Sequence, residues 1–373
     1  MTTFIKKIII FILPIGLIFI VPLFILLTSR EYYSTEKAIE AQTNNPEIVY
    51  GPAYNNIDRL YKKQLVAAKQ PEVVALGSSR VMQFRKEFFI KPESFVNGGG
   101  GASSLLEIEK FIKDLPTDNK IKLIIINLDH EMFKSDKQFT TIYNTEPNII
   151  IKWLKNDWRQ SYLDYFSGKF SLTELLQQSK KSEHIGLNAL IHNSGFRQDG
   201  SYQYGKTLLD HDRDKNLTAE FAATLESIKN DRSSFIFSKE IPDSTMKTVD
   251  DILRLCQERG IYVIGYLPPM PRQFYNKISN IDDDYKANML SLPKKVGLIF
   301  SERNFDFYNF SDIKTINATD EEFVDAQHGT DKIYIRIAIY MSLKNKQLHK
   351  YINSDNLIKL LQDTKKDFIE IPQ

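Results

Sequence analysis

Two short segments of this chain carry side chains suited to nucleophilic chemistry. The segment VVALGSSR ends in Ser78, Ser79 and Arg80, and the segment DAQH, close to the C-terminus, holds Asp325 and His328. A serine hydroxyl is a weak nucleophile at neutral pH and needs a general base beside it. An imidazole is such a base, and a carboxylate can orient it. The two segments are therefore the parts of a nucleophilic serine site.

Each segment also has a simpler interpretation, which the sequence leaves open. Serines that follow a strand often cap the next helix with their side chains. A carboxylate three residues before a histidine often marks a helix start with a surface histidine nearby. The order of the parts favours the site, because the serines follow the first predicted strand and the histidine follows the last.

The elements that must position these side chains alternate between strand and helix patterns. Apolar or β-branched runs predict buried strands at 72–77, 94–98, 122–129, 262–269 and 305–311. Apolar residues at helical spacing predict helices at 56–69, 105–115 and 246–259. This alternation predicts an α/β fold whose parallel sheet is covered by helices on both faces. Ligands in such folds bind beyond the carboxyl ends of the strands, where Ser79, Gly98 and Asp129 fall.

A stretch from about 135 to 241 interrupts the alternation. It shows helical patterns at 149–166, 172–181 and 217–230, and no convincing strand. We interpret it as a helical insertion above the strand ends. Its aromatic and glycine-rich loop at 195–205 would either line a substrate channel or pack locally, and the sequence does not decide between these.

The N-terminal region predicts a membrane anchor. Residues 8–28 are uncharged and rich in Ile, Leu and Phe, which is enough at 1.5 Å per residue to cross a hydrocarbon core of about 30 Å. Lys6 and Lys7 precede this run, so residues 1–7 are expected in the cytoplasm, 29–55 as a stalk and 56–373 as an extracytoplasmic domain. A cleaved signal peptide is the alternative, but no cleavage pattern follows the run.

The composition excludes several other classes of function. The chain is 42% hydrophobic and 26% charged with a net charge of +2, so nucleic acid is not an expected partner. Cys256 is the single cysteine and lies on a predicted apolar helix face, which favours an inert buried thiol. The six histidines are scattered without zinc-ligand spacing. No metal and no cofactor is expected.

The ordered blocks resemble the SGNH/GDSL hydrolase superfamily. The likeness is closest to its membrane-anchored extracytoplasmic branch, which includes DltD-like and alginate O-acetylation proteins. Gly77, Ser78 and Ser79 match the block that follows the first strand, and Asp325 and His328 match the late D-x-x-H block. The resemblance implies a three-layer, doubly wound, flavodoxin-like parallel sheet of the SGNH type. It also implies a catalytic triad, with Ser79 as nucleophile, His328 as general base and Asp325 as the carboxylate that fixes the imidazole tautomer.

The glycine tract at 97–101 matches the next block of the family. Glycines let the backbone approach a ligand closely, and amides at a helix start suit a negative oxygen. The resemblance implies that the amides of Gly98 and Ser79 form an oxyanion hole. A dinucleotide-binding fingerprint is the competing interpretation of the tract, but its spacing does not match.

The third block departs from the family pattern. Asp129 occupies the position of the usual Asn donor, and Asn127 occupies that of a glycine. An ionised Asp cannot donate a hydrogen bond, so Asn127 or His130 is expected to assist the oxyanion hole. Arg80, Asp129 and His130 are expected to contact the substrate.

The resemblance implies a membrane-anchored O-acyltransferase or esterase that acts on a cell-envelope polysaccharide or a teichoic-acid-like polymer. Its expected partners are that polymer and a multi-spanning membrane acyltransferase. A non-catalytic accessory or scaffold protein with the same fold is the alternative from another class. An ordinary esterase without a transferase partner is a third.

Overall fold

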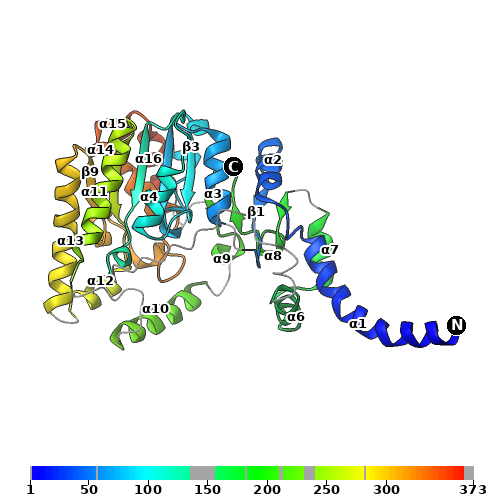
Figure 1. The fold of residues 1–373 in the computed structure, drawn as a ribbon. Helices are drawn as coiled ribbons and strands as arrows, with labels where there is room; N and C mark the ends of the chain where they lie inside the picture. The colour runs from blue at the N-terminus through cyan, green and yellow to red at the C-terminus, as the bar shows by residue number, and fades with distance from the viewer. Residues whose placement is uncertain are drawn as a thin grey trace. The chain divides into compact units, whose positions relative to one another are not determined.

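The structure is a computed structural model that describes residues 2–55, 58–134, 156–180, 183–209, 213–230, 240–280 and 283–364. The chain divides into two compact units (Figure 1). Unit 1 comprises 1–57, 143–198 and 202–206, and unit 2 comprises 58–142, 199–201 and 207–373.

Unit 2 contains a five-stranded parallel sheet in the order β3-β2-β4-β8-β9. Its strands are β2 (Val73–Gly77), β3 (Phe95–Gly99), β4 (Leu123–Asn127), β8 (Tyr262–Leu267) and β9 (Asp306–Asn309). Numbered by their order in the chain, the strands lie in the order 2-1-3-4-5. The second strand is added on one side of β2 and the later strands on the other, so the strand order switches between β2 and β4. Ligands bind at such a switch point in open α/β sheets.

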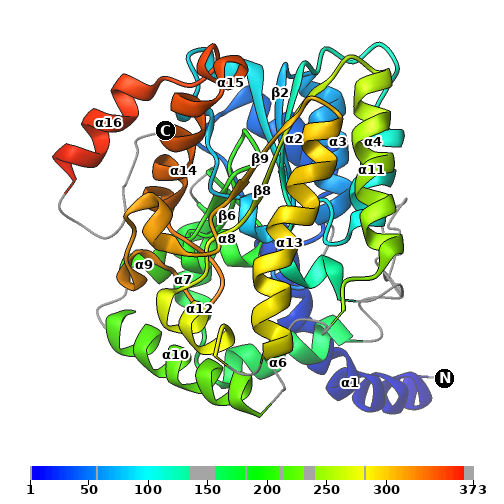
Figure 2. The ribbon, with the colours of Figure 1, turned by 90° about the vertical axis from the view of Figure 1, so that its left-hand side faces the viewer.

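Helices cover both faces of this sheet (Figure 2). On one face α4 (Leu105–Lys113), α11 (Asp243–Glu258) and α13 (Asp283–Glu302) pack side by side, and α14 (Asp331–Lys344) lies on the other. Alternate residues of a strand point to opposite faces. Val73 and Ile125 accordingly belong to the core that includes α14, whereas a Cβ at Gly265 would collide with the Phe300 ring of α13.

The remaining helices of unit 2 complete this core or connect its strands. They are α3 (Asp58–Lys69), α10 (Arg213–Lys229), α12 (Arg272–Ile278), α15 (Lys346–His349) and α16 (Ser354–Asp363), with the 3-10 helices η1 (Ser79–Val81), η2 (Lys86–Phe88), η3 (Pro92–Ser94), η4 (His130–Phe133), η6 (Ile313–Ile316) and η7 (Asp320–Glu322). The short helix α9 (Lys206–Leu209) lies where the chain passes from unit 1 back to unit 2.

Unit 1 is built from three separate stretches of the chain. Its elements are α1 (Thr2–Thr28), α2 (Thr35–Asn44), β1 (Val49–Tyr50), α6 (Trp158–Phe166), α7 (Leu172–Ser179), β5 (His184–Ile185), α8 (Leu187–His192), β6 (Gly195–Phe196) and β7 (Tyr202–Gln203). The four short strands form a sheet in the order β5-β1-β6-β7. Ile25, Phe170, Leu175, Leu190 and Ile191 form its apolar core.

The α/β prediction is confirmed, and each of the five predicted strands corresponds to one strand of the parallel sheet. The interval 135–241 differs from its prediction, because it also contains the short strands β5, β6 and β7. These strands are two residues long, too short for an alternating pattern to reveal them. Residues 149–155 of the first predicted helix lie outside the described residues.

The N-terminal 55 residues contain the helices α1 and α2 and the strand β1. The predicted stalk carries α2 and β1 of unit 1. By length and hydropathy together, none of the helices in the described ranges meets the requirement for crossing a membrane.

Candidate active site

Ser79 lies in a sharp turn at the carboxyl end of β2. Gly77 adopts φ = 144°, a region that favours glycine, and a Cβ there would collide with the side-chain oxygen of Asn127. Ser78 then caps the short helix η1, its Oγ accepting a hydrogen bond from the Arg80 amide at 3.1 Å. Ser79 is the first residue of η1. The first serine of the pair therefore caps the turn, and the Oγ of the second takes no part in this capping.

Asp325 and His328 lie in a tight loop between η7 and α14. A bridge between Phe323 and Gly329 closes the loop, with the Val324 amide donating to the His328 carbonyl at 2.7 Å. Asp325 Oδ1 accepts hydrogen bonds from the amides of Gln327 and His328, both at 2.7 Å. The carboxylate thus shapes the loop that carries the imidazole.

A continuous chain of hydrogen bonds joins these three side chains. His328 Nδ1 lies 2.7 Å from Asp325 Oδ2 and 2.9 Å from Asp325 Oδ1. On the other side of the ring, His328 Nε2 lies 2.8 Å from Ser79 Oγ. A general base must lie within about 2.6–3.2 Å of the proton donor, and this geometry meets that requirement.

The site combines partial exposure with a carboxylate that stays ionised. The side chains of His328 and Asp325 are 22% and 32% exposed. Burial raises the pKa of Asp325, but hydrogen bonds from the His328 ring and from the amides of Gln327 and His328 outweigh it and hold the pKa below its usual value. An ionised Asp325 favours the tautomer with hydrogen on Nδ1, which leaves Nε2 to accept the Ser79 proton.

The amides of the glycine tract are engaged within the protein. Gly99 donates to the Asn97 side chain at 2.8 Å, Gly100 to the Gly77 carbonyl at 2.9 Å, and Gly101 to the Gly98 carbonyl at 3.0 Å. The backbone amide of Asn97 points away from the sheet and donates to the Asp199 backbone carbonyl at 2.7 Å. Because successive amides of a strand point to opposite edges, the Gly98 amide points toward β2.

The Ser79 amide is the remaining candidate for an oxyanion donor. It has no acceptor within hydrogen-bonding distance in the described part of the chain. It also belongs to the first turn of η1, where helical amides lack internal partners. Of the two amides expected in the oxyanion hole, the Ser79 amide is therefore the one that faces no acceptor within the described ranges.

Asn127 and Asp129 belong to a buried hydrogen-bond network. Asn127 Oδ1 accepts hydrogen bonds from Ser78 N at 3.0 Å and from Ser78 Oγ at 3.2 Å. The Ser78 amide fixes this orientation, so Asn127 Nδ2 points to Asp129 Oδ1 at 2.9 Å. Arg80 Nη1 pairs with the same oxygen at 3.4 Å, and Arg80 Nη2 donates to the Pro269 carbonyl.

His130 is also buried, at the start of the short helix η4 that follows β4. Its Nε2 lies 2.8 Å from Ser311 Oγ, which in turn donates to Asn309 Oδ1 at 2.6 Å. Burial, assisted by the charge of Arg80, lowers the pKa of His130 to about 3. This histidine therefore stays neutral at physiological pH.

The three residues expected to contact the substrate are buried in this structure. Arg80, Asp129 and His130 are 8%, 1% and 3% exposed. Their hydrogen bonds end on protein groups and support the Ser78 turn and the neighbouring strand ends, while Arg80 Nε and Asp129 Oδ2 are buried with no partner among the described residues. The reason is local: a carboxylate beside a buried guanidinium lowers the cost of burying both charges.

Sequence reasoning missed two supports of the site. The Asn97 side chain donates to the carbonyls of Val81 at 2.9 Å and Phe84 at 2.8 Å, which fixes the segment after Ser79 to β3. The Tyr334 hydroxyl of α14 donates to the Arg80 carbonyl. The polar Asn97 within an apolar strand was a signal for the first, whereas nothing in the sequence marked Tyr334.

The described residues contain no group of three or more His, Cys, Asp or Glu side chains arranged to hold a metal ion. Comparisons of the chain with protein-family models, curated proteins and solved structures found no match.

Proposed function

We propose that the chain is a serine-dependent O-acyltransferase or ester hydrolase. The observation that carries this proposal is the hydrogen-bonded chain from Asp325 through His328 to Ser79, with distances of 2.7 and 2.8 Å. The same two serines separate into a turn-capping Ser78 and a Ser79 that faces the imidazole. Ordinary turn chemistry explains Ser78 and does not require a histidine beside Ser79.

The proposed reaction passes through an acyl-enzyme. Ser79 Oγ attacks the ester carbonyl carbon while its proton moves to His328 Nε2. The bond between this carbon and the alcohol oxygen then breaks, and His328 returns the proton to the departing alcohol. A hydroxyl of the acceptor, or water, gives its proton to His328 and attacks the acyl carbon. The bond between this carbon and Ser79 Oγ then breaks, and His328 returns the proton to Ser79 Oγ. Asp325 stabilises the imidazolium in both steps.

We propose that the fold of unit 2 is of the SGNH type. The strand order 2-1-3-4-5 is that of flavodoxin-like sheets, and it supports this assignment. Ser79 follows β2 beside the point where the strand order reverses. The resemblance in the four short blocks of sequence supports the same assignment.

We also propose that the protein works at a membrane, with its N-terminus in the cytoplasm and the site outside. The support is the apolar surface of α1, on which Phe4, Ile10, Phe11 and Leu27 are 67–73% exposed. Protease added to intact cells, or to spheroplasts if an outer membrane is present, should digest the large domain. Protection of that domain would exclude this orientation.

The proposed substrates are ester groups on a cell-envelope polysaccharide or a teichoic-acid-like polymer. The proposed partner protein is a multi-spanning membrane acyltransferase. Both come from the resemblance. Deletion of the gene should lower the ester content of one envelope polymer, and the full-length chain should restore it. Unchanged polymer esters, together with rapid hydrolysis of p-nitrophenyl acetate, would favour an ordinary esterase.

A serine-directed fluorophosphonate tests the chemistry directly. The wild-type protein should be labelled, and Ser79→Ala should abolish labelling without loss of stability. Ser78→Ala is the matched control: it should remain labelled but lose about 1 kcal/mol of stability with its turn hydrogen bonds. If Ser79→Ala were still labelled, Ser79 would not be the nucleophile.

A non-catalytic accessory protein is the second candidate. The observation that favours it is the engagement of the Gly99, Gly100 and Gly101 amides and of the Asn127 side chain within the protein. Loss of one oxyanion donor costs about 10² to 10³ in rate. A folded wild-type protein that does not react with the fluorophosphonate would favour this candidate.

A further inference from the structure

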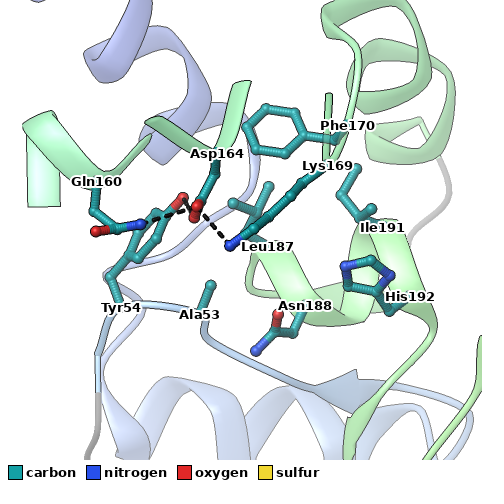
Figure 3. A pocket seen from close by; sticks show the side chains of 10 residues that line it. All are labelled: Ala53, Tyr54, Gln160, Asp164, Lys169, Phe170, Leu187, Asn188, Ile191 and His192. Carbon is teal, nitrogen blue, oxygen red and sulfur yellow. Dashed lines mark hydrogen bonds and ion pairs between the residues drawn. The ribbon is translucent and has the colours of Figure 1, made fainter. Parts of the chain in front are cut away.

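Unit 1 contains a cavity that the proposed chemistry does not use. Its volume is about 470 Å³, within the range of about 300–1,000 Å³ of small-molecule sites. The cavity is lined by Ala53 and Tyr54, by Gln160 and Asp164 of α6, by Lys169 and Phe170, and by Leu187, Asn188, Ile191 and His192 of α8 (Figure 3).

The floor and the rim of this cavity differ in character. Phe170, Leu187 and Ile191 are buried and give the cavity an apolar floor. Gln160, Lys169 and His192 are exposed, so the rim is polar and open to water. A ligand that fits must therefore present both apolar and polar surface.

Asp164 organises the polar wall. Its Oδ1 accepts hydrogen bonds from Gln160 Nε2 at 2.9 Å and from Lys169 Nζ at 2.7 Å, and its Oδ2 accepts one from the Tyr54 hydroxyl at 2.9 Å. Figure 3 shows these three side chains converging on the carboxylate. The charges of Asp164 and Lys169 balance each other, which leaves the wall polar but without a net charge.

Several atoms of the wall keep capacity for a ligand. An ammonium group has three N–H donors, and Lys169 uses one of them on Asp164. Asn188 uses its Nδ2 on the Pro52 carbonyl at 3.1 Å, so its Oδ1 can accept. Gln160 likewise uses its Nε2, so its Oε1 can accept. Donors and acceptors thus lie around one apolar floor.

The buried Glu31 holds this arrangement in place. Its Oε1 accepts from the Tyr54 amide at 2.6 Å, and its Oε2 accepts from the Leu187 amide at 2.9 Å. These amides belong to two separate segments of the lining. A site whose walls are fixed in this way loses less conformational entropy when a ligand binds.

From this lining we propose that the cavity binds a neutral sugar residue of a glycan. A sugar ring has C–H faces that can pack on Phe170 and Leu187, and it has adjacent hydroxyl groups that both donate and accept. One hydroxyl can accept from Lys169 Nζ, and a neighbouring one can donate to Asn188 Oδ1. The inference does not depend on the chemistry of Ser79.

Other ligand classes fit the lining less well. An acyl chain would cover the polar atoms of Lys169 and Asn188 without offering them partners, which carries a desolvation cost. A small anion would find the Lys169 charge already balanced by Asp164. A hydroxyl-rich, uncharged ligand satisfies both the polar wall and the apolar floor.

Saturation-transfer NMR with the full-length protein tests this proposal. The probes are maltotriose, cellotriose and chitotriose, which carry no O-linked esters and so cannot be turned over by Ser79. Hexanoate serves as the probe for an acyl chain. At least one sugar should give saturable transfer at millimolar concentration, with the C–H protons of one ring receiving the strongest signal.

Two variants locate the binding, and a third controls for charge. Lys169→Met and Asn188→Ala should each weaken sugar binding at least tenfold. Lys122→Met, which removes an exposed ammonium paired with Glu72 in unit 2, should bind as the wild type does. If Lys169→Met fails to fold, Asn188→Ala decides. Tighter binding of hexanoate than of any sugar, no saturable sugar binding, or binding unaffected in these variants would overturn the proposal.

Discussion

Two polar clusters lie at the carboxyl ends of neighbouring strands in unit 2, and they are built in opposite ways. In the proposed triad, Asp325, His328 and Ser79 are partly exposed, and the imidazole lies between a carboxylate and a hydroxyl. In the second cluster, Asp129 and Arg80 are buried, and their hydrogen bonds end on Asn127 and on a backbone carbonyl. Both contain a carboxylate beside a cationic or titratable partner.

The difference shows which cluster is suited to proton transfer. A proton carrier must gain and lose charge, and partial exposure keeps the cost of that change small. A charge that is buried against a fixed partner is costly to alter. We therefore expect substitutions in the triad to reduce rates with little effect on stability, and substitutions in the buried cluster to do the reverse.

The largest effect is expected for His328→Gln. Without an imidazole, Ser79 has no base, so hydrolysis of p-nitrophenyl acetate should fall by about 10⁴ to 10⁶-fold. The free energy of unfolding in urea should change by less than about 1 kcal/mol, because the side chain is partly exposed. His349→Gln, an exposed histidine of α15, is the control and should keep its rate. Equal rates in the two variants would contradict a role of His328 as base.

The next largest effect is expected for Asp325→Asn. An Asn oxygen can still accept from the amides of Gln327 and His328, so the loop should persist. Its amide group would then face His328 Nδ1 and favour the tautomer with hydrogen on Nε2, which cannot accept the Ser79 proton. The rate should fall by about 10⁴-fold. The control is Asp355→Asn, in the exposed first turn of α16, which should leave the rate unchanged. If the rate of Asp325→Asn fell as little as that of the control, Asp325 would not be a member of the triad.

Asp129→Asn should have the opposite effect, with a loss of stability and little loss of rate. The substitution leaves the buried Arg80 without its counter-charge, which should cost about 3 kcal/mol in urea unfolding. The rate per folded molecule should fall by no more than about tenfold, because Asn127 can still hold Ser78. Asp250→Asn breaks the half-exposed pair with Arg303 and should cost under about 1 kcal/mol. A loss of rate comparable to that of Asp325→Asn would give Asp129 a direct part in the chemistry.

The smallest effect is a dependence of stability on pH through His130. Its pKa is about 3 in the folded protein, whereas an exposed histidine has a pKa of about 6.5. The unfolded chain therefore binds a proton first, and stability is lost as the pH falls below about 6.5. Between pH 7 and pH 5.5 the wild type should lose about 1 kcal/mol more than His130→Gln does. Identical pH profiles would mean that His130 is not buried as a neutral ring.

Much of the fold followed from local patterns in the sequence. Strands such as Leu123–Asn127 are apolar runs, the strand Asp306–Asn309 lies in a segment rich in aromatic residues, and helices such as Leu105–Lys113 have apolar residues at helical spacing. The short strands of unit 1 had no such signal, because two residues cannot show a period. Their pairing joins β1 near residue 50 to β5 and β6 beyond residue 183, which no local pattern contains.

The candidate site likewise combines features visible in the sequence with features that only the tertiary structure sets. The sequence by itself determined the residue types: a serine after a glycine at a strand end, and an Asp and His three residues apart in a late loop. Tertiary structure alone decided the partners. It brought His328 to Ser79 across 249 positions of the chain, and it turned Asn127 toward Ser78 and Asp129 toward Arg80. The physical reason is that strand and turn preferences act between neighbouring residues, whereas burial and hydrogen-bond partners depend on which distant segments the packed sheet brings together.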